Sequence, residues 1–186
     1  QVGVHPQARG DVKVILGPAH HRPAVARGQL DVVGDLAGRE VRQPPVTDLA
    51  GLHQLQVLVL YGNRINDEGT VALESLGELR QLDMSLLGIT DKSLLHLVPL
   101  GKLERLELLY SEGFGGTNLT NAGMATLGSL TQLKVLNLVG AKISDEGLAR
   151  LARLVALEQL QITNTPVSDG AVKRLQAALP GCQIRR

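Results

Sequence analysis

Aromatic residues are almost missing from the sequence: Phe114, Tyr61 and Tyr110 are the complete set, and there is no tryptophan. The core must therefore be built from aliphatic side chains, and platforms that stack the bases of single-stranded nucleic acid are not expected. The sequence also has no excess of one charge, because it contains 19 Lys and Arg residues and 18 Asp and Glu residues. The net charge of +1 gives no bulk attraction to nucleic acid or to an anionic membrane.

Cysteine and long apolar runs are equally scarce. The single cysteine, Cys182, excludes a disulfide framework within the chain and says little about the compartment. No apolar run approaches the roughly 18 residues that a membrane-spanning helix needs, so no membrane span is expected. The chain begins with Gln1 rather than methionine, which indicates a fragment or a processed product and leaves the localisation open.

Leucine is distributed unevenly and divides the chain into two regions. Residues 1–50 contain four leucines, nine valines and five of the eight prolines, whereas residues 51–186 contain 31 leucines. We therefore predict a boundary near Pro44 and Pro45, with an N-terminal segment over residues 1–45 and a second domain over residues 46–186. The N-terminal segment has short apolar runs without a sustained period. This predicts irregular or weakly ordered chain with one or two short strands, or a wrongly assigned start of the reading frame.

The second region repeats itself. The pattern L-x-x-L-x-x-L-x-L, with an aliphatic residue at each L position, recurs with spacings of 24, 24, 30 and 24 residues, and its copies begin at Leu52, Leu76, Leu100, Leu130 and Leu154. Each copy is followed by an aliphatic residue, a short polar residue and an acid or amide, at residues 65–67, 89–91, 119–121, 143–145 and 167–169. The short polar residue suits a helix N-cap, and the acid or amide suits the positive end of the helix dipole. Each unit is therefore predicted to contain a strand, a turn and a helix or helical turn.

A single unit of this length cannot fold alone, because it buries too little apolar surface to offset the conformational entropy that it loses. Stacked units pack their leucines against one another and pair their strands. Once about three or more units are present, the stabilisation from burial exceeds the loss of conformational entropy. The expected fold class is an α/β solenoid of about five 24-residue repeats. A parallel β-sheet should line its concave face, and short helices should cover its convex face.

The motif L-x-x-L-x-L followed by I-[TS]-D-x-G-L resembles the leucine-rich-repeat superfamily, nearest its ribonuclease-inhibitor-like and cysteine-containing types. It looks most like the repeat proteins of planctomycete-type bacteria. The resemblance covers residues 46–186, and the ending from Leu175 to Ile184 is similar to a closing repeat whose last strand covers the core. What the resemblance implies is a horseshoe-shaped protein-binding module without catalytic residues.

The sequence departs from the family pattern in the turns. Many members place asparagine or cysteine three residues after the last leucine of the strand, and only Asn63 keeps the asparagine. The other units have Leu87, Ser111, Ala141 and Thr165 at this position. We expect these turns to use threonine, serine, water or backbone pairing instead.

Residues between the buried leucines of each strand should face solvent on the concave side, because side chains alternate along a strand. Aligned repeats form three columns there, and the second column places the carboxylates of Asp83 and Glu107 on neighbouring strands. A mixture of carboxylates and exposed apolar groups suits a protein or peptide ligand. For any single residue, an ordinary solvated surface position is the alternative. The candidate partner-binding residues are Val57, Val59, Tyr61, Asp83, Arg105, Glu107, Leu109, Phe114, Asn137, Val139 and Gln161.

The third repeat contains six additional residues within a glycine-rich stretch over residues 110–118, which includes the only phenylalanine. Insertions in solenoids often gather on the binding side. We therefore expect this loop to project from the rim and Phe114 to act as an anchor for the partner. A mobile surface loop, or Phe114 folded back onto the rim, is the alternative.

No residue pattern indicates catalysis. The His20–His21 pair has no cysteine or carboxylate at metal-ligand spacing, and the glycines around Phe114 lack the Lys-Ser/Thr of a phosphate loop. Asp83 and Glu107 resemble the carboxylate pair of a retaining glycosidase only superficially, because no aromatic sugar platform accompanies them. We therefore expect no enzyme activity, metal or cofactor, and a monomer that binds a protein or peptide. Two alternatives stay open: the targeting arm of a larger enzyme or receptor whose other domain precedes residue 1, and a structural or surface repeat protein.

Overall fold

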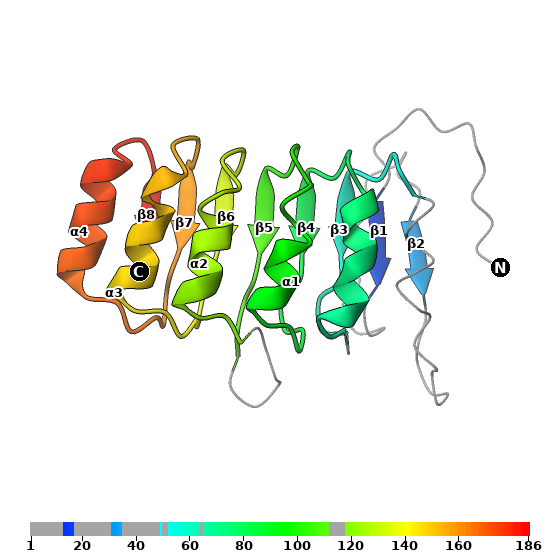
Figure 1. Cartoon of the computed structure of the whole chain (residues 1–186), viewed down its shortest axis with the longest axis horizontal. Coiled ribbons are helices and arrows are strands. Elements are labelled where there is room, and N and C mark those ends of the chain that lie inside the picture. The colour runs from blue at the N-terminus through cyan, green and yellow to red at the C-terminus, as the bar shows by residue number, and fades with distance from the viewer. Residues whose placement is uncertain (1–12, 17–30, 35–48, 50–51, 64, 112–117) are drawn as a thin grey trace.

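All strands belong to one parallel sheet, and the helices cover one of its faces (Figure 1). The structure is a computed structural model that describes residues 13–16, 31–34, 49, 52–63, 65–111 and 118–186. The strands lie in the order β2-β1-β3-β4-β5-β6-β7-β8. Their bounds are β1 Lys13–Leu16, β2 Asp31–Gly34, β3 Val57–Val59, β4 Gln81–Asp83, β5 Arg105–Glu107, β6 Val135–Asn137, β7 Gln159–Gln161 and β8 Gln183–Arg185.

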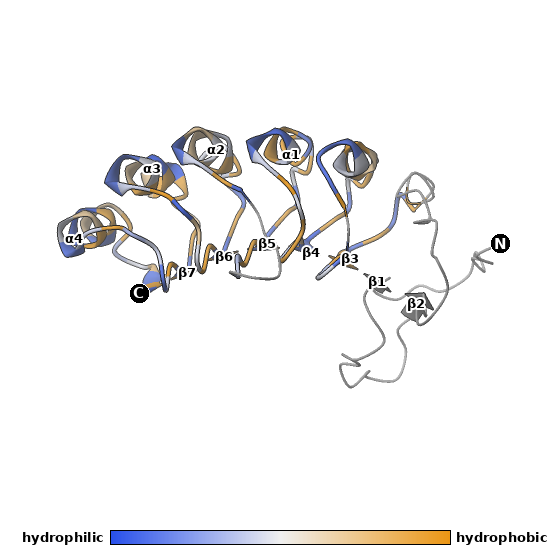
Figure 2. Ribbon diagram, turned by 90° about the horizontal axis from the view of Figure 1, so that it is seen from below, coloured by the Kyte–Doolittle hydropathy of each residue, from blue (hydrophilic) through white to orange (hydrophobic). Residues whose placement is uncertain are grey.

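One helix or helical turn follows each strand from β3 to β7, as the repeat pattern predicts. These segments are η2 Glu68–Ser75, α1 Asp91–Leu95, α2 Asn121–Leu127, α3 Asp145–Ala149 with η3 Arg150–Arg153, and α4 Asp169–Ala178. Seen along the strands, the helices form the outer arc and the strands the inner arc (Figure 2). The free face of the sheet is therefore concave, and the predicted fold class is confirmed.

The core lies between the two arcs and is aliphatic. The middle residue of each strand from β3 to β7 is a leucine with at most 1% of its surface exposed: Leu58, Leu82, Leu106, Leu136 and Leu160. Among the described residues, no aromatic side chain belongs to the buried core. Cys182 is buried there as a free thiol beside the closing strand β8.

In the turns that follow the strands, different donors bond the backbone carbonyl oxygens. Asn63 donates from Nδ2 to the carbonyl oxygen of Leu60 at 2.8 Å, and Thr165 donates from Oγ1 to the carbonyl oxygen of Ile162 at 2.6 Å. Ala141 has only its backbone N–H to donate, which reaches the carbonyl oxygen of Leu138 at 3.0 Å. Threonine and backbone pairing thus replace the missing asparagines, as expected.

A ladder of hydrogen bonds connects the start of each helix to the next repeat. The acid or amide of one repeat accepts from the backbone N–H of the next repeat's Ser or Thr, and it also bonds that residue's hydroxyl group. The heavy-atom distances range from 2.5 to 2.9 Å. We call the four pairs the Asp–Thr ladder: Asp67 with Thr90, Asp91 with Thr120, Asn121 with Ser144, and Asp145 with Ser168.

The same Ser and Thr residues act as helix N-caps, so the sequence prediction of capping is confirmed at three helices. Thr90, Thr120 and Ser168 accept from backbone N–H groups of their own helices. Ser144 makes no such cap bond, and its hydroxyl group donates to Glu146 instead. Each capping hydroxyl therefore joins its own helix to the preceding repeat.

Strands β1 and β2 lie in the N-terminal segment. They extend the parallel sheet beyond β3, and β1 pairs with both β2 and β3. This agrees with the one or two short strands expected in this segment. The proposed boundary at residue 45 lies outside the described residues and stays a proposal.

Candidate functional site

The parallel register brings the predicted columns together on the concave face. The first column pairs Val57, Gln81, Arg105, Val135 and Gln159 in succession. The second column pairs Val59, Asp83, Glu107, Asn137 and Gln161. Both columns agree with the sequence prediction, because the leucine spacing fixes which residue of each strand points into the core.

A hollow lies on this face over β3, β4 and β5. Five of the candidate residues line it: Val57, Val59, Asp83, Arg105 and Glu107. Gln81, Leu58 and Leu82 complete the lining. Sequence reasoning left Gln81 out of the candidate set, although its place between Val57 and Arg105 in the first column was a usable signal. The hollow combines two apolar side chains with two carboxylates and one guanidinium group.

The charges in the hollow are unevenly matched. Arg105 Nη1 lies 2.9 Å from Glu107 Oε1, so these two side chains form an ion pair. Asp83 Oδ1 accepts from the backbone N–H of Ser85 at 2.9 Å, and no ion pair among the described residues includes Asp83. Burial raises the pKa of Asp83, the negative charge of Glu107 adds to the rise, and the hydrogen bonds from Ser85 oppose it. The hollow therefore holds a half-buried carboxylate that forms no ion pair with the cations of the described residues.

The remaining candidate residues lie outside the hollow. Asn137 and Gln161 continue the second column on β6 and β7, and Asn137 Oδ1 accepts from the backbone N–H of Val139 at 2.9 Å. Tyr61 and Leu109 follow the ends of β3 and β5 and are half-buried. Phe114 lies outside the described residues, so its role as an anchor stays a prediction.

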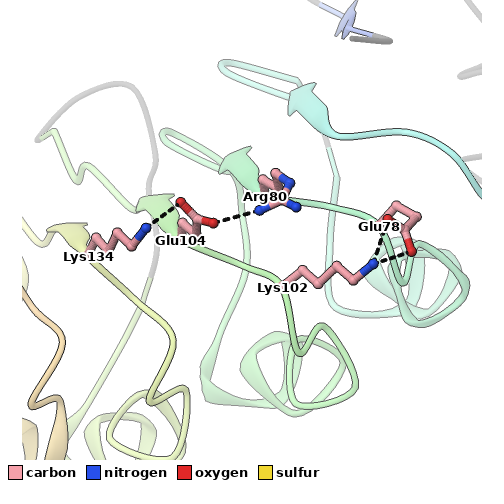
Figure 3. Close-up of polar contacts among 5 residues, drawn as sticks. All are labelled: Glu78, Arg80, Lys102, Glu104 and Lys134. Carbon is pink, nitrogen blue, oxygen red and sulfur yellow. Dashed lines mark hydrogen bonds and ion pairs between the residues drawn. The ribbon is translucent and has the colours of Figure 1, made fainter. Parts of the chain in front are cut away.

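Charged side chains also cross the repeats where the chain enters the strands (Figure 3). Glu104 contacts Arg80 at 2.7 Å and Lys134 at 3.0 Å, and Lys102 contacts Glu78 at 2.6 Å. The hydrogen bond from Lys134 is the main cause that lowers the pKa of Glu104. Exposed pairs of this kind contribute little to stability. Every charged group of this row already contacts an opposite charge, although Glu104 alone serves two cations.

The helical face carries a small apolar patch. Val71 on η2, Leu95 on α1 and Val98 just after α1 are each at least half exposed. His96 is half-buried, and its Nδ1 contacts Glu74 Oε1 at 2.5 Å.

In the part of the chain that the structure describes, no group of three or more His, Cys, Asp or Glu residues is arranged to hold a metal ion. None of the described helices is long and apolar enough to cross a membrane.

Solved structures of repeat proteins share this architecture. Internalin C2 of Listeria monocytogenes matches with a TM-score of 0.59 and 25% sequence identity, over 83% of this chain and 56% of that protein. A leucine-rich-repeat protein of Leptospira interrogans matches with a TM-score of 0.55 and 24% identity, over 75% and 33%. A further Listeria internalin matches with a TM-score of 0.52 and 20% identity, over 83% and 45%. The chain thus spans about half, or less, of the proteins that it matches.

The repeat pattern, the parallel sheet and these similarities together define a leucine-rich-repeat solenoid. The sequence matches no protein-family model and no curated protein. The ribonuclease-inhibitor-like type and the planctomycete resemblance stay predictions from the sequence.

Proposed function

We propose that the chain is a non-catalytic binding module that holds a protein or peptide on its concave face. The observation that carries the proposal is the hollow over β3, β4 and β5, in which Val57 and Val59 lie beside Asp83 and Glu107. Apolar groups provide the surface that drives association, and half-buried polar groups provide orientation and specificity. Curved repeat arrays use the concave face in this way.

The location of the other charged groups supports the same face. The carboxylate of Glu104 is paired with two cations, and the Asp–Thr ladder uses its carboxylates between repeats. Asp83 is different, because it is half-buried and forms no ion pair with any described residue. A partner that covers the hollow gains more from this group than from any of the matched pairs.

The test is a capture experiment with charge-reversed variants. The native chain, an Asp83→Arg/Glu107→Arg variant and a Glu68→Arg/Glu158→Arg control are immobilised and exposed to source-cell lysate. Glu68 and Glu158 are exposed residues outside the hollow, so the control matches the change in net charge. Circular dichroism and thermal melting must first agree for all three proteins. We expect the native chain and the control to retain a protein that the hollow variant loses.

Two results would contradict the proposal. Equal retention by all three proteins would place the binding site elsewhere. Retention of nothing specific by the native chain would favour a structural or surface repeat protein.

A further inference from the structure

The hollow also indicates the chemistry of the group that it binds, and this inference rests on the function proposed above. Asp83 carries a negative charge on a half-buried side chain, and its Oδ1 already accepts from the Ser85 backbone N–H. The nearest positive group in the lining, Arg105, is committed to Glu107 at 2.9 Å. A half-buried carboxylate without a cation is costly, and an incoming positive charge removes that cost.

The geometry suits a single cationic side chain. Asp83 and Glu107 are register partners on β4 and β5, and neighbouring strands lie about 4.8 Å apart, so a cation that pairs with Asp83 also lies close to Glu107. The ion pair of Glu107 with Arg105 leaves one net negative charge among these three groups. Val57 and Val59 line the adjacent part of the hollow. They can pack against the methylene groups of a long basic side chain while its charged end reaches the carboxylates.

We propose that the hollow binds an arginine or lysine side chain of a protein partner. An acidic group is repelled by Asp83, because Arg105 is paired with Glu107, and a purely apolar group leaves Asp83 covered without compensation. Burial raises the pKa of Asp83, Glu107 adds to the rise, and the Ser85 hydrogen bonds oppose it.

The test uses three acetylated, amidated peptides of sequence Gly-Val-X-Val-Gly, in which X is arginine, citrulline or glutamate. Citrulline keeps the shape of arginine but has no charge, so it isolates the electrostatic part of binding. Each peptide is titrated into the isotope-labelled chain, and the backbone amide resonances of Ser85 and Glu107 are followed by NMR. We expect the arginine peptide to shift both resonances with about tenfold higher affinity than the citrulline peptide. The glutamate peptide should leave them unchanged.

An Asp83→Asn/Glu107→Gln variant provides the matched comparison. Asn137 and Gln161 occupy the same column on β6 and β7, so the chain already folds with these residue types at equivalent positions. The variant should lose the preference for arginine over citrulline. A Glu68→Gln/Glu158→Gln control, altered outside the hollow, should keep it.

Three outcomes would overturn the inference. Equal shifts with the arginine and citrulline peptides would mean that the concave face binds peptides independently of the charge of this side chain. This result would not contradict the proposed function. A preference for arginine that survives in the Asp83→Asn/Glu107→Gln variant would assign it to other residues. No shift with any peptide would show that the hollow does not recognise a basic side chain, while the capture experiment decides the proposed function separately.

Discussion

Asp83 and Asn137 show how one column of the sheet can carry two different properties. Both side chains accept a hydrogen bond from the backbone N–H two residues further along the chain, at 2.9 Å in each case. The two residues therefore perform the same local task. Asp83 additionally places a charge in the hollow, and burial raises its pKa. The charge is not needed to form the turn, which agrees with the binding role that we propose for it.

We predict that Asp83→Asn stabilises the chain at neutral pH. A carboxyl group whose folded-state pKa is raised binds its proton more tightly in the folded state. It therefore lowers the stability at pH values above its unfolded pKa of about 3.9, and this penalty is absent at lower pH. In urea unfolding, Asp83→Asn should raise the free energy of unfolding at about pH 7 but not at about pH 3. Equal stability changes at both pH values would contradict this account.

At the scale of secondary-structure elements, the Asp–Thr ladder explains two glycines that stand two residues after the amide or acid, Gly123 and Gly147, whereas the last repeat has Ala171 at this position. A Cβ atom at Gly123 would lie 2.1 Å from Oδ1 of Asp91, and one at Gly147 would lie 2.3 Å from Oδ1 of Asn121. The glycine therefore makes room for the side chain that arrives from the preceding repeat. Ser93 occupies this position in the second repeat, and its hydroxyl group donates to Asp67 at 2.6 Å instead.

We predict that Gly123→Ala destabilises the chain by about 1–3 kcal/mol, because the added methyl group displaces the Asp91 carboxylate and breaks its bonds to Thr120. In an Asp91→Ala background the same substitution should cost much less, since the carboxylate is already gone. Urea unfolding of the two single variants and the double variant measures this coupling. Additive effects would mean that the glycine is required for another reason.

The ladder also predicts a specific acid sensitivity. Burial raises the pKa of Asp67, but hydrogen bonds from Ser93 and Thr90 outweigh it and lower the pKa overall. The pKa of Asp145 is lowered by the Ser168 hydroxyl group and backbone N–H. A lowered pKa gives stability that is present above the unfolded pKa of about 3.9 and is lost as the pH falls through the folded pKa.

An Asp67→Asn/Asp145→Asn variant should therefore lose less stability than the native chain when the pH falls from about 5 to about 3. Asn121 already occupies one rung, which shows that an amide fits the ladder. Unfolding free energies across this pH range provide the measurement. An unchanged pH dependence would mean that other carboxyl groups dominate acid unfolding.

For the whole molecule, the solenoid arrangement means that each repeat packs mainly against its two neighbours. Leu106 lies in the middle strand of the leucine repeats, with none of its surface exposed. We predict that Leu106→Ala lowers the free energy of unfolding by about 2–5 kcal/mol. Because cooperativity passes through neighbouring repeats, this change should also separate the unfolding of the repeats on its two sides.

Hydrogen exchange resolved along the chain measures both effects. Val155→Ala is the matched control, because Val155 is 80% exposed and should change stability by less than about 0.5 kcal/mol. Uniform loss of protection in Leu106→Ala would indicate that the repeats unfold as one unit.

The spacing of the leucines was sufficient to predict the strands, their parallel register and the two columns of the concave face. These features follow from the alternation of side chains, which is local. The Asp–Thr ladder was not predicted, because Asp67 and Thr90 meet only through the three-dimensional offset between consecutive repeats. Sequence reasoning assigned the acids to the helix dipole alone. The match of Arg105 with Glu107, which leaves Asp83 without a cation, likewise depends on side-chain conformations that spacing does not determine.

The Asp–Thr ladder has a consequence for how such a chain can evolve. In each internal repeat the Thr or Ser that bonds backwards and the Asp or Asn that bonds forwards are adjacent in sequence, as in Thr90-Asp91 and Ser144-Asp145. The Asp or Asn of one repeat can therefore bond the Thr or Ser of an identical copy placed after it. A gene duplication that inserts one whole repeat creates a new rung without leaving a polar group unmatched, and an exact deletion restores the old one. The array can thus change its length, and with it the extent of the concave face, without a second compensating mutation.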